Sequence, residues 1–507
     1  MKSHNNDRDI IIIGAGFAGL AAGIYAQLNG YRTQIFEMHN HPGGLCTAWK
    51  RKGYTIDGCI HWLVGSSPHS GMHHLWEEVG IAQGREFIYM NEYMRIEDAN
   101  GRELIFYTDV NKLEKHLLEF SPQDEKPIME FIRGIRMCLP FDQASRLDPP
   151  LKKLYKKLKV MLTFMAHGRK MQQWMKLTAE DFALQFKDPL LSEAFLEMWI
   201  PEFSMFFMLF TFAYLHNKNA GYPIGGSRPM SQALEDRYLK VGGLVHYNKR
   251  VDSILVENDN AVGIRLEDGA KHRCGKVISA ADGYTTIFKM LEGKYVDEKT
   301  REPYKKWPVF PPLIYVALGV NRTFKDITPS VSGLCYSLKK PVEIGGETRE
   351  RLWVHIYNQD PTLAPAGKTS LTIMLSTDYE YWKKLYSDKA AYNQKKEEIG
   401  QTIVDLIEQR FPGIKSQTEV IDVATPLTFE RYTGNWKGSF EGWLITPENS
   451  HVIMKPMSQT LPGLQNFYMC GQWVEPGGGL PTSVMSAERL IKKLCKEDNK
   501  KFRATRD

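Results

Sequence analysis

The fold is decided by residues 7–39, DRDIIIIGAGFAGLAAGIYAQLNGYRTQIFEMH, in a chain of 507 residues. Ile10 to Ile13 form a continuous β-branched run, which is typical of a central parallel strand covered on both faces. A glycine-rich turn follows, and a helix is predicted from about Phe17 to Asn29, before Gly30. Tyr31 to Phe36 predict a second strand. The chain therefore begins with a β–α–β unit of an α/β fold.

The glycines of this unit have the spacing of a phosphate-binding turn. Gly14 suits the tight turn, Gly16 lets the backbone approach a pyrophosphate, and Gly19 lets the helix pack close to the strand. The helix start at Phe17 and Ala18 directs free N–H groups and the positive end of the helix dipole toward the phosphates. The unit therefore predicts a dinucleotide site.

Glu37 ends the second strand, where a carboxylate accepts hydrogen bonds from the adenosine ribose. An acid at this point disfavours a 2′-phosphate, so NAD and FAD remain as candidates and NADP does not. We find no second strand–GxGxxG–helix unit in the sequence, so a separate nicotinamide-binding domain is not expected.

The bulk properties are those of a globular protein with two or more lobes. The net charge of +6 and pI near 8.7 give a mild basic excess. The seven cysteines form no CxxC pair, which predicts reduced thiols in a cytoplasmic protein. We expect no signal peptide and no membrane-spanning helix, because the N-terminus is polar and every apolar run is interrupted.

Three further glycine-containing segments favour FAD over NAD as the expected cofactor. Gly43-Gly44 resembles the signature of two-dinucleotide-binding-domain flavoproteins, in which this pair passes beside the FAD diphosphate. Residues 461–472, LPGLQNFYMCGQ, resemble the segment that contacts the ribityl chain, although Gly471-Gln472 replaces the usual Gly-Asp. The turn at 477–482, GGGLPT, leads into a helix predicted from Ser483 to Leu494 and suits the flavin pyrimidine edge.

The chain as a whole resembles the phytoene desaturase superfamily, particularly its carotenoid isomerase and retinol saturase branch. The blocks that carry the resemblance are residues 221–269, beginning GYPIGGSRPMSQALEDRYLKVGG, and residues 57–62, DGCIHW. The resemblance implies non-covalent FAD, a lipophilic polyene or isoprenoid substrate, and an adenine contact at Val251. The cofactor-binding residues expected on these grounds are Gly14, Gly16, Phe17, Ala18, Gly19, Glu37, Gly43, Gly44, Val251, Gly471, Gln472, Gly479, Pro481 and Thr482.

The expected fold class is α/β: a Rossmann-like FAD-binding domain of the amine-oxidase-like type, with an α+β substrate domain. Residues 1–100, 221–300 and 446–507 are expected to form the discontinuous FAD-binding domain. Residues 101–220 and 301–445 carry no nucleotide motif and are assigned to the substrate domain.

Two helices in this second part are open to two interpretations each. Residues 151–176 place apolar side chains at helical spacing with lysines between them, typical of a helix on an anionic bilayer or of a solvated surface helix. Residues 199–215 are rich in Phe and Met, as in an apolar pocket or a buried core helix.

The leading functional hypothesis is an FAD-dependent oxidoreductase that desaturates or saturates a C–C bond of a lipophilic molecule. His61 and Glu475 are the expected catalytic residues near the flavin. The alternatives are a flavin-dependent double-bond isomerase, an amine oxidase, and a non-enzymatic lipid-binding escort. The histidine-rich segment around His39 and His41 lacks acidic partners at ligand spacing, so no metal is expected. Peripheral membrane contact stays open, as does oligomeric state, and no nucleic-acid partner is expected.

Overall fold

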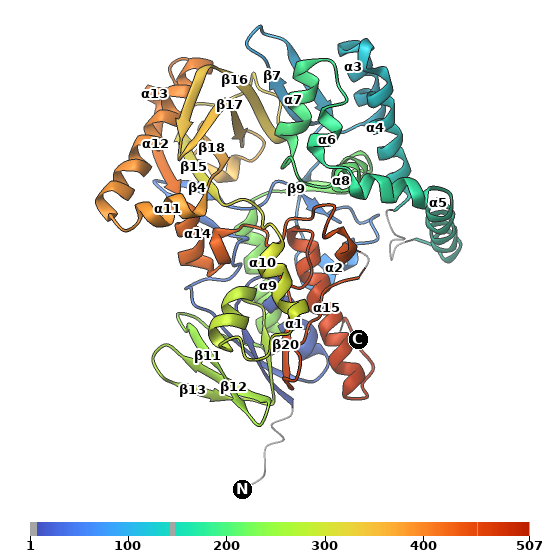
Figure 1. The fold of residues 1–507 in the computed structure, drawn as a ribbon, viewed down its shortest axis with the longest axis vertical. Helices are drawn as coiled ribbons and strands as arrows, with labels where there is room; N and C mark the ends of the chain where they lie inside the picture. The colour runs from blue at the N-terminus through green and yellow to red at the C-terminus, as the bar shows by residue number, and fades with distance from the viewer. Residues whose placement is uncertain (1–7, 142–147, 454, 506–507) are drawn as a thin grey trace.

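The computed structural model describes residues 8–141, 148–453 and 455–505. Figure 1 shows a lower part that contains both ends of the chain and an upper part with a β-sheet on one side and helices on the other. Among the described residues, no helix combines the length and apolar character needed to cross a membrane.

The lower part is built on a five-stranded parallel sheet in the order β10-β2-β1-β14-β20. Its strands are β1 (Asp9–Ile13), β2 (Arg32–Phe36), β10 (Leu244–His246), β14 (Lys276–Ser279) and β20 (Phe467–Met469). Segments from the start, middle and end of the chain therefore meet in one Rossmann-like sheet, which confirms the expected fold class.

The apolar run in β1 is explained by layers on both faces of this sheet. Ile10 and Ile12 pack into the cluster formed with the helices, whereas Ile11 and Ile13 pack with residues of a small antiparallel sheet. The helices are α1 (Phe17–Leu28), α9 (Ser227–Lys240) and α15 (Gly479–Glu497), and the small sheet contains β11 (Val251–Glu257), β12 (Asn260–Leu266) and β13 (Lys271–Arg273). Alternate side chains of one strand thus serve two cores.

The last helix begins earlier than the sequence predicted. α15 starts at Gly479 instead of Ser483, and its N-cap is Gly478, with φ +70°. Pro481 and Thr482 therefore belong to the first helical turn, and the free N–H groups of this helix lie at the glycine turn itself.

The upper part contains a seven-stranded sheet in the order β19-β15-β18-β17-β16-β7-β8. Its strands are β7 (Glu92–Glu97), β8 (Glu103–Tyr107), β15 (Leu313–Val320), β16 (Ser330–Ile344), β17 (Glu347–Ile356), β18 (Thr369–Ser376) and β19 (Thr418–Ala424). Val316 and Leu318 of β15 pack against α12 (Lys389–Arg410), and Tyr315 and Ala317 pack on the other face against Ile56. Ile56 belongs to the hairpin β3 (Ala48–Arg51) and β4 (Tyr54–Asp57).

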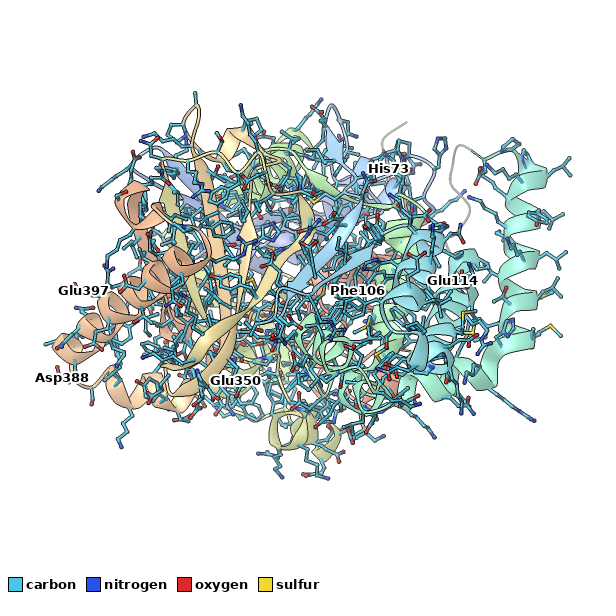
Figure 2. All side chains as sticks on the ribbon, turned by 90° about the horizontal axis from the view of Figure 1, so that it is seen from above. His73, Phe106, Glu114, Glu350, Asp388 and Glu397 are labelled. Atoms are coloured by element: carbon cyan, nitrogen blue, oxygen red, sulfur yellow. The ribbon has the colours of Figure 1, made fainter. Side chains whose placement is uncertain are left out.

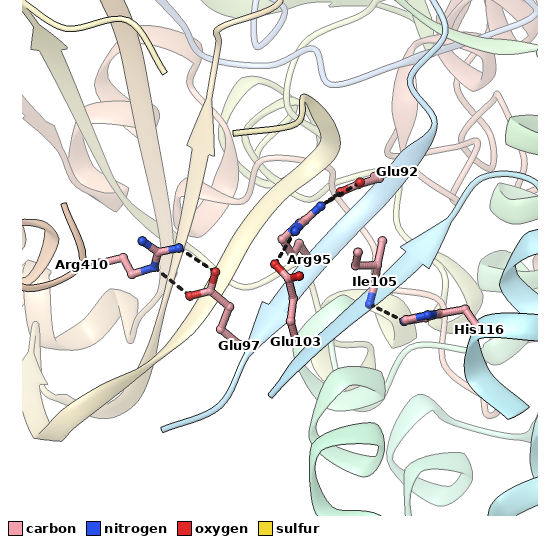
Figure 3. Close-up of polar contacts among 7 residues, drawn as sticks. All are labelled: Glu92, Arg95, Glu97, Glu103, Ile105, His116 and Arg410. Carbon is pink, nitrogen blue, oxygen red and sulfur yellow. Dashed lines mark hydrogen bonds and ion pairs between the residues drawn. The ribbon is translucent and has the colours of Figure 1, made fainter. Parts of the chain in front are cut away.

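β7 lies within the first 100 residues but belongs to the upper sheet, because it pairs in parallel with β16. Its Glu97 also accepts two hydrogen bonds from Arg410 at the end of α12, at 2.7 and 2.8 Å (Figure 3). By strand pairing, β7 therefore belongs to the upper sheet. The division of the chain at residue 100 stays a prediction.

Helices form the other side of the upper part (Figure 1). They are α3 (Val110–Phe120), α4 (Glu125–Cys138), α5 (Pro150–Lys176), α6 (Ala179–Ala183), α7 (Pro189–Met198) and α8 (Met205–His216). α8 packs against α4 and α5, and α5 lies at the outer edge.

Gly19→Ala is expected to destabilise the protein. A Cβ at Gly19 would overlap the carbonyl oxygen of Gly14 and lie 3.2 Å from the Cβ of Ala280. Overpacking of this kind costs about 1–3 kcal/mol, and flavin retention should fall with it. The measurement is urea unfolding together with the flavin absorbance of the purified protein.

The matched control is Gly168→Ala in α5, where an added Cβ meets nothing within 4 Å. Alanine should stabilise this helix position by about 0.5–1 kcal/mol relative to glycine. Equal unfolding free energies for Gly19→Ala and the wild type would contradict the packing argument.

Candidate functional site

A cavity of about 1750 Å³ runs between the lower sheet, the β3–β4 hairpin and α8. Ligand pockets typically measure about 300–1,000 Å³. The cavity therefore has room for more than one ligand, such as a dinucleotide and a substrate.

Most of the residues predicted from the sequence line this cavity. They are Gly14, Gly16, Phe17, Ala18, Glu37, Gly43, Gly44, His61, Val251, Gly471, Gln472, Gly479, Pro481 and Thr482. Gly19 and Glu475 are not among the described lining residues. Gly19 instead lies where α1 passes the turn at Gly14.

The two glycine turns lie against each other at one end of the cavity. The Gly43 N–H donates to the carbonyl of Ala15 at 2.9 Å, and Gly16 and Gly43 form a parallel bridge. Gly14, with φ +97°, makes the sharp turn and donates to the carbonyl of Phe36 at 2.8 Å. This cradle of bare backbone fits the diphosphate of a dinucleotide.

Glu37 is buried beside this cradle. Its carboxylate accepts hydrogen bonds from the N–H groups of Ala15 at 2.6 Å and His39 at 2.8 Å. Burial raises the pKa of Glu37, and the two backbone donors act in the opposite direction. Each oxygen keeps a further lone pair, which fits a pair of ribose hydroxyl donors.

Asp57 joins three segments of the chain next to the cavity. Its Oδ1 accepts from the Ser227 hydroxyl at 2.6 Å and from the N–H of Cys59 at 2.9 Å, and its Oδ2 accepts from the Ser227 N–H at 2.5 Å. Tyr315 of β15 donates its hydroxyl proton to the Asp57 carbonyl. Burial raises the pKa of the Asp57 carboxyl, whereas these donors and the N-terminus of α9 favour its charge.

A second carboxyl, Glu441, lines the cavity where the glycine turn of α15 begins. A Cβ at Gly478 would overlap the Glu441 carboxylate. Burial raises the pKa of Glu441 to about 7. Sequence reasoning missed this residue, since a single acid in GSFEGW matches no motif.

His61 lies in the wall of the cavity with His355 of β17 behind it. The two Nδ1 atoms are 3.2 Å apart, and the rings meet edge to face. Burial lowers the pKa of His61 to about 4 and that of His355 well below its usual value. Both imidazoles are therefore neutral at pH 7, and one Nδ1 must donate to the other.

Glu475 comes just before the glycine turn at 477–479. Its carboxylate forms an ion pair with Arg489 of α15 at 2.6 Å, and its N–H donates to the carbonyl of Gly471 at 2.9 Å. Burial raises the pKa of Glu475, and Arg489 acts in the opposite direction. This contact holds the turn to the helix.

The other half of the cavity is aromatic. Its wall contains Trp62, Trp199, Phe203, Phe206, Phe207, Phe210, Tyr214 and Phe440. The opposite face of α8, with Met208, Leu209 and Phe212, is buried in the core. Both interpretations of this Phe-rich segment therefore hold, one for each face of the helix.

A Rossmann-like sheet with a bare glycine cradle, a buried acid beside it and a second helix N-terminus is typical of a dinucleotide-binding flavoprotein. Residues 17–490 match the protein family described as flavin containing amine oxidoreductase. The chain belongs to this family, and it is an FAD-dependent oxidoreductase.

Two relatives of the chain carry names of carotenoid enzymes. The chain is 25% identical to a phytoene desaturase (neurosporene-forming) of Rhodobacter capsulatus, over 96% of this chain and 93% of the relative. It is 24% identical to a chloroplastic prolycopene isomerase of Daucus carota, over 97% and 81%. The resemblance to phytoene desaturases and carotenoid isomerases is thus confirmed.

Two solved structures share the fold. An oxidoreductase from Methanosarcina mazei aligns over 96% of this chain and 100% of its own, with TM-score 0.56 and 18% identity. Cyclohexylamine oxidase from Brevibacterium oxydans aligns over 97% and 100%, with TM-score 0.57 and 13% identity.

Asp57→Asn is expected to weaken both the fold and flavin retention. The amide nitrogen would face N–H and O–H donors in place of an acceptor, and hydrogen bonds to a buried charge contribute about 1.5–3 kcal/mol each. We expect a loss on the order of 2–3 kcal/mol in urea unfolding. The exposed Asp326, changed to Asn, is the control. An unchanged midpoint for Asp57→Asn would refute this role.

Proposed function

We propose that the protein transfers two electrons to or from a C–C bond of a lipophilic polyene or isoprenoid, as a desaturase or saturase. One observation carries the proposal: the glycine-lined and aromatic halves belong to one cavity and meet near Glu441. The relatives named as carotenoid enzymes support the substrate class.

FAD, when bound, supplies the two-electron acceptor or donor. The glycine cradle and Glu37 are proposed to hold its AMP end, Val251 its adenine, and the turn at 477–479 its reactive edge. The aromatic wall binds an extended apolar chain and excludes water from it. The N–H groups at the start of α15 favour negative charge at that end of the cavity.

Glu441 is proposed as the proton donor or acceptor. Its carboxyl lines the cavity and has a pKa near neutrality, which suits acid–base work in both directions. His61 is proposed to contact the substrate or the flavin as a neutral wall residue. Glu475 is proposed to position the flavin-edge turn through Arg489.

The second candidate is a double-bond isomerase in which the flavin undergoes no net redox change. The likeness to a prolycopene isomerase favours it, and the same cavity serves both reactions. We also propose peripheral contact with a membrane, because a polyene or isoprenoid substrate partitions into lipid.

The test is to reduce the bound flavin without oxygen and to add polyenes, retinoids and unsaturated fatty acids. Flavin reoxidation with a hydrogenated product supports a saturase, and an isomerised product without reoxidation supports the isomerase. Flavin reduction by a saturated substrate supports a desaturase. No turnover in any direction would overturn the proposal.

Glu441→Gln is expected to lower kcat by roughly 10²–10⁴-fold and to remove one limb of the pH profile. A base needs the carboxylate, so a desaturase rate should rise through pH 7 in the wild type. An acid needs the protonated carboxyl, so a saturase or isomerase rate should fall through pH 7 instead.

Glu448→Gln is the control, since Glu448 is an exposed acid on the same segment. The Glu448→Gln variant should keep the change in rate near pH 7. If the Glu441→Gln variant keeps the change in rate near pH 7, Glu441 is excluded as the titrating group.

A further inference from the structure

The apolar stripe of α5 faces away from the protein. In a surface helix of a globular protein, side chains repeating every three or four residues normally face the core. Here Leu151 is 81% exposed and Met165 is 77% exposed. The exposed members of the stripe are Leu151, Leu154, Tyr155, Leu158, Met161, Leu162 and Met165. In Figure 2, this helix stands at the right edge of the molecule.

α5 is attached to the body by its other face, mainly near its C-terminus. Trp174 and Met171 are buried near the C-terminus, and the Ser204 hydroxyl donates to the carbonyl of Trp174 at 3.3 Å. The buried side chains of Met171 and Trp174 therefore fix which face of the helix points outward. Near the N-terminus, Asp148 forms local ion pairs with Lys152 at 2.7 Å and Lys156 at 2.8 Å.

Basic side chains border the exposed stripe. The helix sequence, PLKKLYKKLKVMLTFMAHGRKMQQWMK, has no Asp or Glu. At 100° per residue, Lys157 lies on one side of the stripe and Lys159 on the other. An apolar stripe between rows of cations matches the surface of a bilayer that contains anionic lipid.

The exposed helix also connects to the aromatic wall of the cavity. Phe164 of α5 contacts Phe141, and Phe141 contacts Phe210, with ring centroids 5.6 Å apart in each pair. Phe210 lines the cavity.

We propose that the outer face of α5 docks in the plane of an anionic lipid bilayer and brings the aromatic half of the cavity next to the lipid. The apolar stripe would enter the interface, and the bordering lysines would contact lipid phosphates. This inference rests on the proposed function, because contact with a bilayer would give the protein access to a lipid-soluble substrate.

The test is co-sedimentation of the full-length holoprotein with vesicles. One set contains phosphatidylcholine alone, and the other contains phosphatidylcholine with phosphatidylglycerol. The wild type should bind the anionic vesicles more tightly, on the order of tenfold or more, with loss at high salt. Lys157→Gln with Lys159→Gln should reduce that preference. Leu158→Glu with Met165→Glu should abolish binding to both sets.

Leu184→Glu is the matched control, because Leu184 is 78% exposed but lies outside α5. It should bind like the wild type. Absence of wild-type binding, or equal binding by the Leu158→Glu, Met165→Glu variant, would overturn the proposal. A dimer that this variant converts to monomer, without vesicle binding, would assign the face to a second copy of the chain.

Flavin content and turnover in detergent are measured on the same variants. Detergent delivers the substrate without a bilayer, so the α5 variants should keep both. Vesicle binding without turnover by any variant would leave the docking proposal standing and remove only the proposed function. Turnover in detergent without vesicle binding would leave the proposed function standing and remove only the docking proposal.

Discussion

The arrangement of the site depends on the buried carboxylate of Asp57. Asp57 ends the β3–β4 hairpin, and its carboxylate accepts hydrogen bonds from Ser227, at the start of α9, and from the backbone that leads to His61. A charge removed from water is tolerated only when donors replace the water, and here the donors come from segments 170 positions apart. Satisfying this one group therefore places the hairpin, α9 and the cavity wall together.

Two of the carboxyls in the cavity region, Asp57 and Glu441, show how the environment assigns different tasks to the same group. Asp57 is surrounded by donors, so its charge is solvated by the protein although burial opposes it. Glu441 is half-buried in the cavity wall, and burial raises its pKa to about 7. A carboxyl with fixed donors stabilises structure, whereas one without them exchanges a proton near neutral pH.

The sequence was sufficient for features that depend on neighbours along the chain. The β1–turn–α1 unit and Glu37 were predicted because strand period, glycine spacing and helix stop all lie within about thirty residues. The His61–His355 contact spans 294 positions, and β7 joins a strand from far along the chain. No local pattern encodes such pairs. The lysine-rich pattern of α5 predicted an amphipathic helix, but which face meets the core is decided by the buried side chains of Met171 and Trp174.

The two halves of the cavity differ in polarity, and each suits a different ligand: one the cofactor and the other the substrate. The glycine half exposes backbone N–H groups near His39, Arg228 and Arg250, which favours a charged diphosphate. In the aromatic half, the Phe210 ring contacts Phe141, and Phe141 contacts Phe164 on α5. A polyene leaving a bilayer must avoid water, because each exposed methylene costs about 0.8 kcal/mol. Under the docking proposal, contact of α5 with the bilayer would bring this aromatic wall next to the lipid and shorten the exposure of the substrate to water.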